Sequence, residues 1–435
     1  MMIPKRNCYF LCKNVIATLL FCTFLFFLIH HYFSYSSSES SKSHPEHFFF
    51  EQKNVTQSAS DIWHVDSSVQ HANNAVLLSH ETHVFYYPWY GNPEDDSVYL
   101  HWNHEYIPNW DKQDTNTYPV GKHSPPDDIG ANFYPLLGCY SSKNPVTVAQ
   151  HMKWIRQSGI GVLVISWYPP DLSDKEGKPF DQLFPMFLDS ARIYGLKISF
   201  HIEPYEGRTP ENLRKNIEYI INKYGNHSAL YKMQKSRSNK KPLPVFYVYD
   251  SYLNSPNSWS SVLSIGGKQS IRNSDMDGIF LGLVVELRHK QDIVSGGFDG
   301  FYTYFAANDF SYGSSWKNWK SLSAFARKNG LLFVPSVGPG YKDTQVRPWN
   351  AKTTRERKSG KYYKVAWTTA LQTSPPLISI TSFNEWHEGT QIEPAVSKTN
   401  KGYVYNDYSP GEPDFYLNLT RQFVSQYREI LLKKT

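Results

Sequence analysis

Eight short apolar runs, each long enough for one β-strand, recur between residues 84 and 382 and alternate with helix-like segments. Their bounds are Val84–Trp89, Gly161–Trp167, Lys197–Ile202, Pro244–Tyr249, Gly278–Val285, Gly300–Phe305, Leu331–Val337 and Leu377–Ser382. Most runs are continuously apolar, as are strands covered on both faces, so they predict a parallel sheet. Eight strands that alternate with helices over about 350 residues predict a (β/α)8 TIM barrel. A doubly wound open sheet is the alternative.

Helical patterns lie between several of these runs. They cover Thr147–Gln157, Asp181–Tyr194, a segment from Pro210 to Tyr224, Trp316–Lys328 and Lys361–Leu371. The third pattern has the clearest boundaries, because Thr209 is a typical N-cap, Pro210 suits the first helical position and Gly225 follows the last one. No Gly-rich dinucleotide- or phosphate-binding loop accompanies these elements.

The N-terminal part of the chain differs in character from the barrel. Val15–Phe33 contains no Asp, Glu, Lys or Arg, while Lys5, Arg6 and Lys13 precede it. A run of this length is long enough to cross a bilayer as a short helix, with the basic side cytoplasmic. The sequence therefore predicts a cytoplasmic tail (1–14), a transmembrane signal-anchor (15–33), a disordered stem (34–80) and a catalytic barrel (81–435). A cleaved signal peptide is the competing interpretation of the apolar run.

Two further features concern the environment of the barrel. Asn54, Asn226 and Asn418 each begin an N-glycosylation sequon, which fits a lumenal domain that follows a signal-anchor. The net charge is +6, but no long block of Lys and Arg occurs. The densest basic stretch, Lys232–Lys241, is interpreted as a solvated loop, so no nucleic-acid partner is expected.

Aromatic and ionisable residues recur where the predicted strands end. In a (β/α)8 barrel the C-terminal ends of the strands form the active-site face. The last strand is followed by Glu385 and Glu388, two neighbouring carboxyl groups of the kind that glycosidases use as acid and base. Aromatic faces stack on sugar rings, while charged groups bind hydroxyls. The candidate substrate-binding residues at the other strand ends are Trp89, Trp167, Tyr168, Glu203, Tyr302 and Arg347.

Other residues near these positions allow more than one interpretation. Glu393 precedes Pro394 and is interpreted as a loop charge. Arg347 either pairs with a barrel carboxylate or orients a catalytic glutamate. His201 and Glu203 form a His-x-Glu pair, but no third ligand stands at metal spacing, so no metal site is expected. His387 is expected to position its neighbours rather than to bind a metal.

Several motifs together resemble glycoside hydrolase family 99. They are Tyr87-Pro88-Trp89-Tyr90-Gly91, Ser166-Trp167-Tyr168-Pro169-Pro170, His201-Ile202-Glu203-Pro204-Tyr205, Pro335-Ser336-Val337-Gly338-Pro339-Gly340-Tyr341, Arg347-Pro348-Trp349-Asn350 and Phe383-Asn384-Glu385-Trp386-His387-Glu388-Gly389-Thr390-Gln391-Ile392-Glu393-Pro394. The last motif is the most specific. The resemblance extends from about residue 83 to the end of the chain, and the anchor and stem resemble the type II topology of the family's animal Golgi members.

The resemblance implies a retaining endo-α-1,2-mannosidase that acts on glucosylated high-mannose N-glycans of glycoproteins. The expected product is Glc(1–3)Man, formed through a 1,2-anhydro sugar. Glu385 would remove the proton of the substrate's 2-hydroxyl, and Glu388 would protonate the departing oxygen. Glu203, Tyr302 and Arg347 are expected to hold the sugar or to orient the glutamates. No cofactor is needed for this chemistry. The implied location is the Golgi membrane, with the catalytic domain lumenal.

Two other function classes compete with this reading. A lumenal lectin or pseudoenzyme could use the same barrel to bind glycans without cleaving them, although a pure binder has no need of Glu385 and Glu388. A type II Golgi glycosyltransferase would want a sugar-nucleotide site, and Asp275-Met276-Asp277 matches the Asp-x-Asp metal motif. That motif precedes the fifth predicted strand, at the end of the barrel opposite the expected active site.

Overall fold

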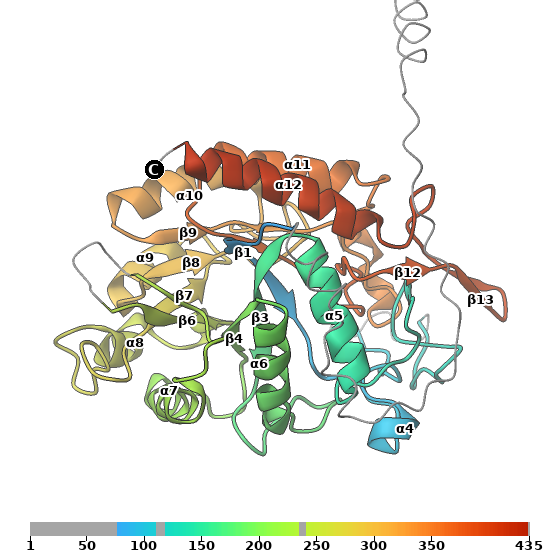
Figure 1. The fold of residues 1–435 in the computed structure, drawn as a ribbon, viewed down its shortest axis with the longest axis horizontal. Coiled ribbons are helices and arrows are strands. Elements are labelled where there is room, and N and C mark those ends of the chain that lie inside the picture. The colour runs from blue at the N-terminus through green and yellow to red at the C-terminus, as the bar shows by residue number, and fades with distance from the viewer. Residues whose placement is uncertain (1–75, 110–117, 235–240, 434–435) are drawn as a thin grey trace, which may run out of the picture. The chain divides into compact units, whose positions relative to one another are not determined.

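The fold is given by a computed structural model that describes residues 76–109, 118–234 and 241–433 (Figure 1). Its strands are β1 (Ser79–Tyr86), β2 (Tyr134–Pro135), β3 (Ile160–Trp167), β4 (Lys197–Ile202), β5 (Lys232–Met233), β6 (Leu243–Val248), β7 (Ile279–Leu283), β8 (Gly300–Tyr302), β9 (Leu332–Val334), β10 (Ser336–Val337), β11 (Ile378–Ile380), β12 (Ala395–Val396), β13 (Lys398–Asn400) and β14 (Tyr403–Tyr405). Each of the eight apolar runs overlaps one of the barrel strands, or two in the case of the seventh run, although β1 begins five residues before its run.

The main sheet is a nearly closed parallel barrel. Its strand order is β10-β11-β1-β3-β4-β6-β7-β8-β9, and every neighbouring pair on this path is parallel. The prediction of a (β/α)8 barrel is therefore confirmed, and the open-sheet alternative is wrong. The short β5 adds an antiparallel pair to β6, which places Lys232, at the start of the basic stretch, on the outer rim of the sheet.

The two ends of the sheet path meet at Pro335. Proline has no N–H and interrupts a strand ladder, so the seventh run divides into β9, which pairs with β8, and β10, which pairs with β11. Hydroxyl side chains bridge this seam. The Ser336 amide donates to Thr303 Oγ1 at 2.9 Å, and the Tyr304 amide donates to Ser336 Oγ at 2.8 Å. Side chains thus complete a ring that the backbone ladder leaves open.

Helices surround the barrel (Figure 1). They are α4 (Pro93–Asp96), α5 (Pro145–Gln157), η2 (Asp181–Leu183), α6 (Phe184–Ile193), α7 (Pro210–Tyr224), η3 (Ser251–Leu253), α8 (Pro256–Leu263), α9 (His289–Gly296), α10 (Trp316–Lys328), η4 (Pro348–Thr353), α11 (Lys361–Gln372) and α12 (Phe415–Leu432). The boundaries of α7 are those predicted, since Thr209 Oγ1 accepts the Asn212 amide at 3.2 Å and Gly225 is the C-cap. All five predicted helical segments are helical in the structure, whereas α8, α9 and α12 were not predicted.

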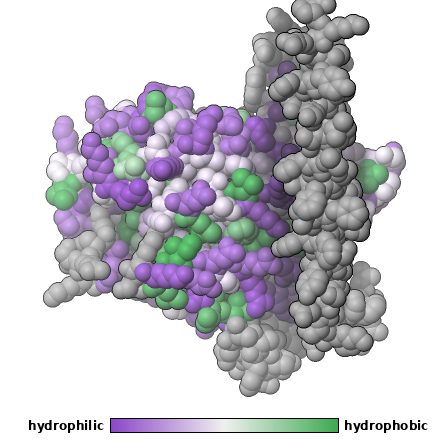
Figure 2. Space-filling view, turned by 90° about the horizontal axis from the view of Figure 1, so that it is seen from above, coloured by the Kyte–Doolittle hydropathy of each residue, from purple (hydrophilic) through white to green (hydrophobic). Residues whose placement is uncertain are grey.

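The anchor and the stem up to residue 75 lie outside the described residues. Within the part of the chain that is described, no helix is long and apolar enough to cross a membrane. On the face drawn in Figure 2, hydrophilic residues predominate and hydrophobic ones form small separate groups. This distribution is expected where helices cover the apolar outer face of a barrel.

Aromatic and polar side chains take up part of the barrel interior. His83 Nδ1 lies 2.8 Å from the Tyr247 hydroxyl. Above this pair, the ring of Phe85 packs against His201 and Tyr302, with ring centroids 4.7 Å and 5.7 Å away. All five side chains are buried. Because side chains alternate along a strand, the next inward positions are those at the C-terminal rim, where the candidate site lies.

Glu393 is a buried anchor, so its interpretation as a loop charge is wrong. Its side chain is 0% exposed. Oε2 accepts hydrogen bonds from the Tyr140 hydroxyl at 2.8 Å and from Trp386 Nε1 at 3.0 Å, and Oε1 lies 3.1 Å from His151 Nε2. His151 in turn bonds the Tyr86 hydroxyl at 2.9 Å. A carboxylate with these partners ties the loop after β11 to α5 and β1, and such a group is costly to disrupt.

Replacement of Glu393 by Ala is expected to destabilise the barrel by about 3 kcal/mol or more, because it leaves buried donors without an acceptor. Urea unfolding of residues 76–435, followed by tryptophan fluorescence, measures this change. The exposed Glu412 provides a matched control, and E412A should unfold within about 0.5 kcal/mol of the unaltered chain. Equal stability of E393A and E412A would contradict the anchoring role.

Candidate active site

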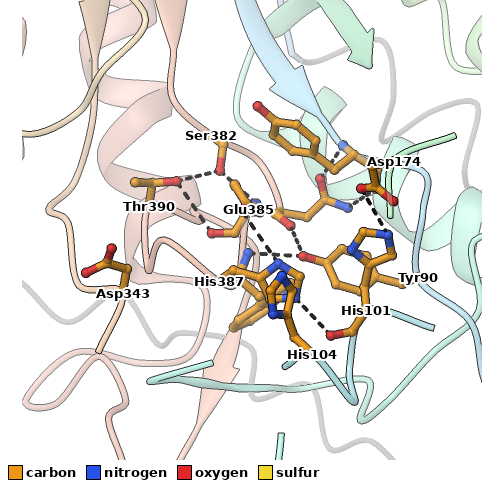
Figure 3. Close-up of polar contacts among 12 residues, drawn as sticks. Tyr90, His101, His104, Asp174, Asp343, Ser382, Glu385, His387 and Thr390 are labelled. Atoms are coloured by element: carbon orange, nitrogen blue, oxygen red, sulfur yellow. Dashed lines mark hydrogen bonds and ion pairs between the residues drawn. The ribbon is translucent and has the colours of Figure 1, made fainter. Parts of the chain in front are cut away.

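The loop after β11 carries the two glutamates and is attached to the end of β1. The side chain of Asn384 pairs with the backbone of Tyr87 in both directions, since Oδ1 accepts the Tyr87 amide at 2.7 Å and Nδ2 donates to the Tyr87 carbonyl at 2.9 Å. The Tyr90 hydroxyl donates to the Asn384 carbonyl at 3.0 Å. Within the loop, the Glu385 amide donates to Ser382 Oγ at 2.8 Å (Figure 3). These bonds fix the backbone on which Glu385 stands.

Glu385 is largely buried. Only 6% of the residue is exposed, and its Oε2 atom is buried without a hydrogen-bond partner among the described residues. Burial raises the pKa of Glu385 well above its usual range, and the charge of Glu388 raises it further, while Arg347 opposes the shift. A carboxylate that no donor stabilises is a strong base, which is the role predicted for this residue.

Glu388 is half-buried on the same loop. Its pKa is raised to about 7 in all: burial raises it most, the cation of Arg347 lowers it, and the charge of Asp343 raises it. Because the charge of Glu388 also acts on Glu385, the two groups titrate as a pair that shares one proton over part of the pH range. One carboxylic acid and one carboxylate are the pair that acid–base catalysis at a glycosidic bond requires.

Arg347 reaches the glutamates from a support built around Asp343. Asp343 is 0% exposed, and its Oδ2 accepts from the Tyr341 hydroxyl at 2.9 Å, from Asn350 Nδ2 at 2.8 Å and from Arg347 Nη1 at 3.2 Å. Arg347 therefore pairs with a buried carboxylate, as the first interpretation expects, and its charge lowers the pKa of both Glu385 and Glu388. Asp343 itself was not anticipated from the sequence, although its four-residue spacing from Arg347 was visible.

Glu203 belongs to a chain of polar contacts that leads down into the barrel. Its Oε1 accepts from the Ser166 hydroxyl at 2.8 Å and lies 3.2 Å from His201 Nδ1. His201 Nε2 lies 2.9 Å from the Tyr302 hydroxyl. Tyr302 is 0% exposed, so it supports Glu203 through His201 and does not itself line the open site. Among the described residues, no group of three His, Cys, Asp or Glu side chains has the arrangement of a metal site.

Trp167 does not lie at the site, and its expected role as a substrate-binding wall is wrong. Its ring is 0% exposed, and Nε1 donates to Asp181 Oδ1 at 2.8 Å. The ring stacks with Tyr219 of α7 at 6.4 Å between centroids. Its strand neighbour Ser166 points to the barrel interior, so alternation along β3 directs Trp167 outward, among the helices.

The other two predicted aromatic residues lie at the rim. Trp89 packs against Tyr87 and His101, with ring centroids 4.5 Å and 4.6 Å away. Tyr168 is 8% exposed and follows β3. Burial raises the pKa of Tyr168, and the charge of Glu203 raises it further.

Several rim residues were not selected from the sequence. Tyr304, two residues beyond Tyr302, bonds through its hydroxyl to that of Tyr87. Burial raises the pKa of Tyr304, and the charges of Tyr87 and Glu388 add to the effect. The available signal was the two-residue spacing of Tyr302 and Tyr304, which predicts that both point to the barrel interior, with Tyr304 nearer the C-terminal end. His101 and His104 lie in the loop after β1, and no sequence motif marks them as residues of the site.

The Asp-x-Asp match has a structural explanation. Asp277 Oδ1 accepts from Arg272 Nη1 at 3.1 Å and from the Gly278 amide at 2.8 Å. Arg272 also donates to Asp299 Oδ2 at 2.9 Å. These residues precede β7 and β8, so they lie at the N-terminal end of the barrel, away from the glutamates. The motif closes a turn and an ion-pair network there.

Comparison with known proteins agrees with this geometry. Residues 77–429 match the model of glycosyl hydrolase family 99. A glycoprotein endo-alpha-1,2-mannosidase of Xenopus laevis is 55% identical over 349 residues, which cover 80% of this chain and 77% of that protein. A human glycoprotein endo-alpha-1,2-mannosidase-like protein is 50% identical over 347 residues, covering 80% of this chain and 76% of that protein.

A solved structure is similar as well. The GH99 endo-alpha-mannosidase from Bacteroides thetaiotaomicron has a TM-score of 0.75 and 43% sequence identity, and the match covers 82% of this chain and 99% of that one. The barrel, the acidic pair after its last strand and these similarities lead to one conclusion. The chain belongs to glycoside hydrolase family 99.

Proposed function

We propose that this chain is a retaining endo-α-1,2-mannosidase. The observation that carries the proposal is the pair Glu385 and Glu388, two buried or half-buried carboxyl groups whose pKa values are both raised, at the C-terminal end of the barrel. Relatives at 50–55% identity bear the name glycoprotein endo-alpha-1,2-mannosidase or the corresponding "-like" name, which supports the choice of bond.

The proposed reaction has two steps. In the first, Glu385 takes the proton of the 2-hydroxyl of the mannose, O2 forms a bond to C1, and the C1–oxygen bond to the rest of the glycan breaks. Glu388 gives its proton to the departing oxygen. In the second, Glu388 takes a proton from water, the water oxygen bonds to C1, the C1–O2 bond breaks, and O2 recovers its proton from Glu385. Two displacements at C1 give net retention.

The surroundings of the glutamates suit these steps. Glu385 has a buried carboxyl oxygen without a hydrogen-bond partner among the described residues, which disfavours the ionised form. The carboxylate therefore binds a proton readily. Arg347, held by Asp343, places a positive charge that limits the rise in the pKa of both glutamates. This charge allows one of the two carboxyl groups to ionise in a site that burial would otherwise keep neutral.

The substrate and the location belong to the same proposal. By resemblance, the substrate is a glucosylated high-mannose N-glycan, and the product is Glc(1–3)Man. Residues 15–33 are proposed to anchor the chain in the Golgi membrane as a single-pass type II protein with a lumenal barrel. Asn226 and Asn418 are exposed, as lumenal glycosylation sites should be, while Asn54 lies outside the described residues.

The direct test is to incubate residues 76–435 with a glucose-capped high-mannose glycan and to analyse the products by mass spectrometry. This range retains β1, which begins at Ser79. Release of a disaccharide or a larger glucosylated fragment is expected. Loss of single sugar units would indicate an exo-acting enzyme, and tight binding without cleavage would favour the lectin alternative.

E385Q and E388Q are each expected to lower kcat by at least about 10²-fold, because each removes one of the two proton transfers. Binding of the glycan should remain measurable by calorimetry, since glutamine keeps the size of the side chain. E429Q, at an exposed position of α12, is the matched control and should retain full activity. Near-normal turnover by either catalytic variant would refute its assigned role.

The pH profile of kcat/KM should be bell-shaped. The pair loses its two protons in two separate steps, because burial raises both pKa values and the charge of Glu388 raises that of Glu385 further. In the singly protonated pair the proton exchanges between the two groups, and the form that reacts is the one in which Glu388 carries it and Glu385 is ionised. The singly protonated pair is the active form, so activity should rise toward pH 7 and fall again in alkaline solution. Initial rates from mildly acidic to alkaline pH measure this, and a flat profile would exclude acid–base work by the pair.

A further inference from the structure

His387 lies against Glu385 with its ring in a defined tautomer. The ring nitrogen Nε2 lies 3.0 Å from the carbonyl oxygen of His101. A carbonyl oxygen accepts hydrogen bonds but cannot donate them, so we assign the proton of the ring to Nε2. Burial lowers the pKa of His387 well below its usual range, with His104 and His101 adding to the effect, so the ring is neutral. Its other nitrogen, Nδ1, therefore carries a lone pair.

That lone pair faces the carboxyl group of Glu385. Nδ1 lies 3.8 Å from Glu385 Oε1, which is longer than a hydrogen bond. Such a distance is expected between two acceptors, since neither atom has a proton to share while Glu385 is ionised. Once Oε1 carries a proton, its O–H can donate to Nδ1 after a small approach. The protonated form of Glu385 thus has a hydrogen-bond acceptor in Nδ1 of His387, whereas the ionised form has no hydrogen-bond donor at this position.

The ring of His387 is held in this orientation from three sides (Figure 3). The ring of His101 stacks on it at 5.6 Å with an angle of 14° between planes, and the ring of His104 meets it edge-on at 4.6 Å. His101 is itself stacked on Trp89 at 4.6 Å, and its Nε2 lies 3.4 Å from Asp174 Oδ2. A ring flip would break the bond to the His101 carbonyl, so the lone pair keeps its direction.

We propose that His387 is a positioning residue whose Nδ1 lone pair is a fixed hydrogen-bond acceptor for the proton that Glu385 takes from the substrate. The inference rests on the proposed role of Glu385 as the base. An acceptor of this kind strengthens the base without touching the sugar, because it stabilises the product of the proton transfer. The charged and titratable groups that also act on Glu385 or His387 are Glu388, Arg347, Asp174, Glu203, His101 and His104.

Two substitutions separate the acceptor from the packing. H387Q places an amide near the position of Nε2, which keeps a donor for the His101 carbonyl but removes the atom that faces Glu385. H387N places an amide near Nδ1, where its NH2 group can turn and donate to the ionised carboxylate. Both variants should lower kcat by about tenfold or more while KM changes less, with the larger loss in H387N.

The pH profile distinguishes this role from a purely structural one. Without the acceptor, Glu385 of the free enzyme holds its proton less tightly, so the alkaline limb of kcat/KM should move to lower pH in both variants, while the acid limb stays. Lower kcat with an unmoved alkaline limb would overturn the proposal. Absence of any fragment release by the unaltered protein would instead refute the proposed function itself.

A spectroscopic measurement covers the case in which the His387 variants do not fold. In ¹⁵N-histidine-labelled residues 76–435, the nitrogen signals of His387 should be those of a neutral ring protonated at Nε2. In E385Q the amide NH2 becomes a donor to Nδ1, so the Nδ1 signal of one neutral, Nε2-protonated histidine should shift alone. The proposal would be overturned if no such histidine responded to E385Q, or if the ring that responds carried its proton on Nδ1 at the pH of activity.

Discussion

The catalytic loop depends on hydrogen bonds that join the last strand of the barrel to the first. The amide of Asn384 pairs with both backbone groups of Tyr87, and the buried carboxylate of Glu393 holds Trp386 against α5 and β1. Glu385 stands between these two attachments. A loop fixed at both ends can keep a carboxylate in a dry position that a flexible loop would exchange for contact with water.

Burial and neighbouring charges together set the pKa values of the two glutamates. Burial alone would keep both glutamates protonated, and two neighbouring charges would repel each other. The cation of Arg347 offsets part of this cost from one side, while His387 offers an acceptor and no donor from the other. Over part of the pH range the site therefore holds one proton between the two carboxyl groups. Arg347 and His387 affect how strongly each group binds that proton.

Much of this arrangement could be predicted from the sequence, because the decisive patterns are local. Each apolar run overlapped its strand or strands, Thr209 and Gly225 marked the limits of α7, and the two glutamates followed a strand closely. The errors concern burial and direction, which depend on distant segments. Trp167 points away from the site because α6 and α7 cover that face of β3, and Glu393 is buried because Tyr140 and His151 arrive from elsewhere in the chain.

The seam at Pro335 has a consequence for how this barrel can vary. In a ring closed by a backbone ladder, almost any residue can supply the closing bonds, since every residue except proline carries the same amide. Here the hydroxyls of Ser336 and Thr303 close the ring. Closure thus depends on the identity of individual side chains. A single substitution at either position can weaken or alter the seam of the barrel, and with it the support of Tyr304 and of the loop that carries the glutamates.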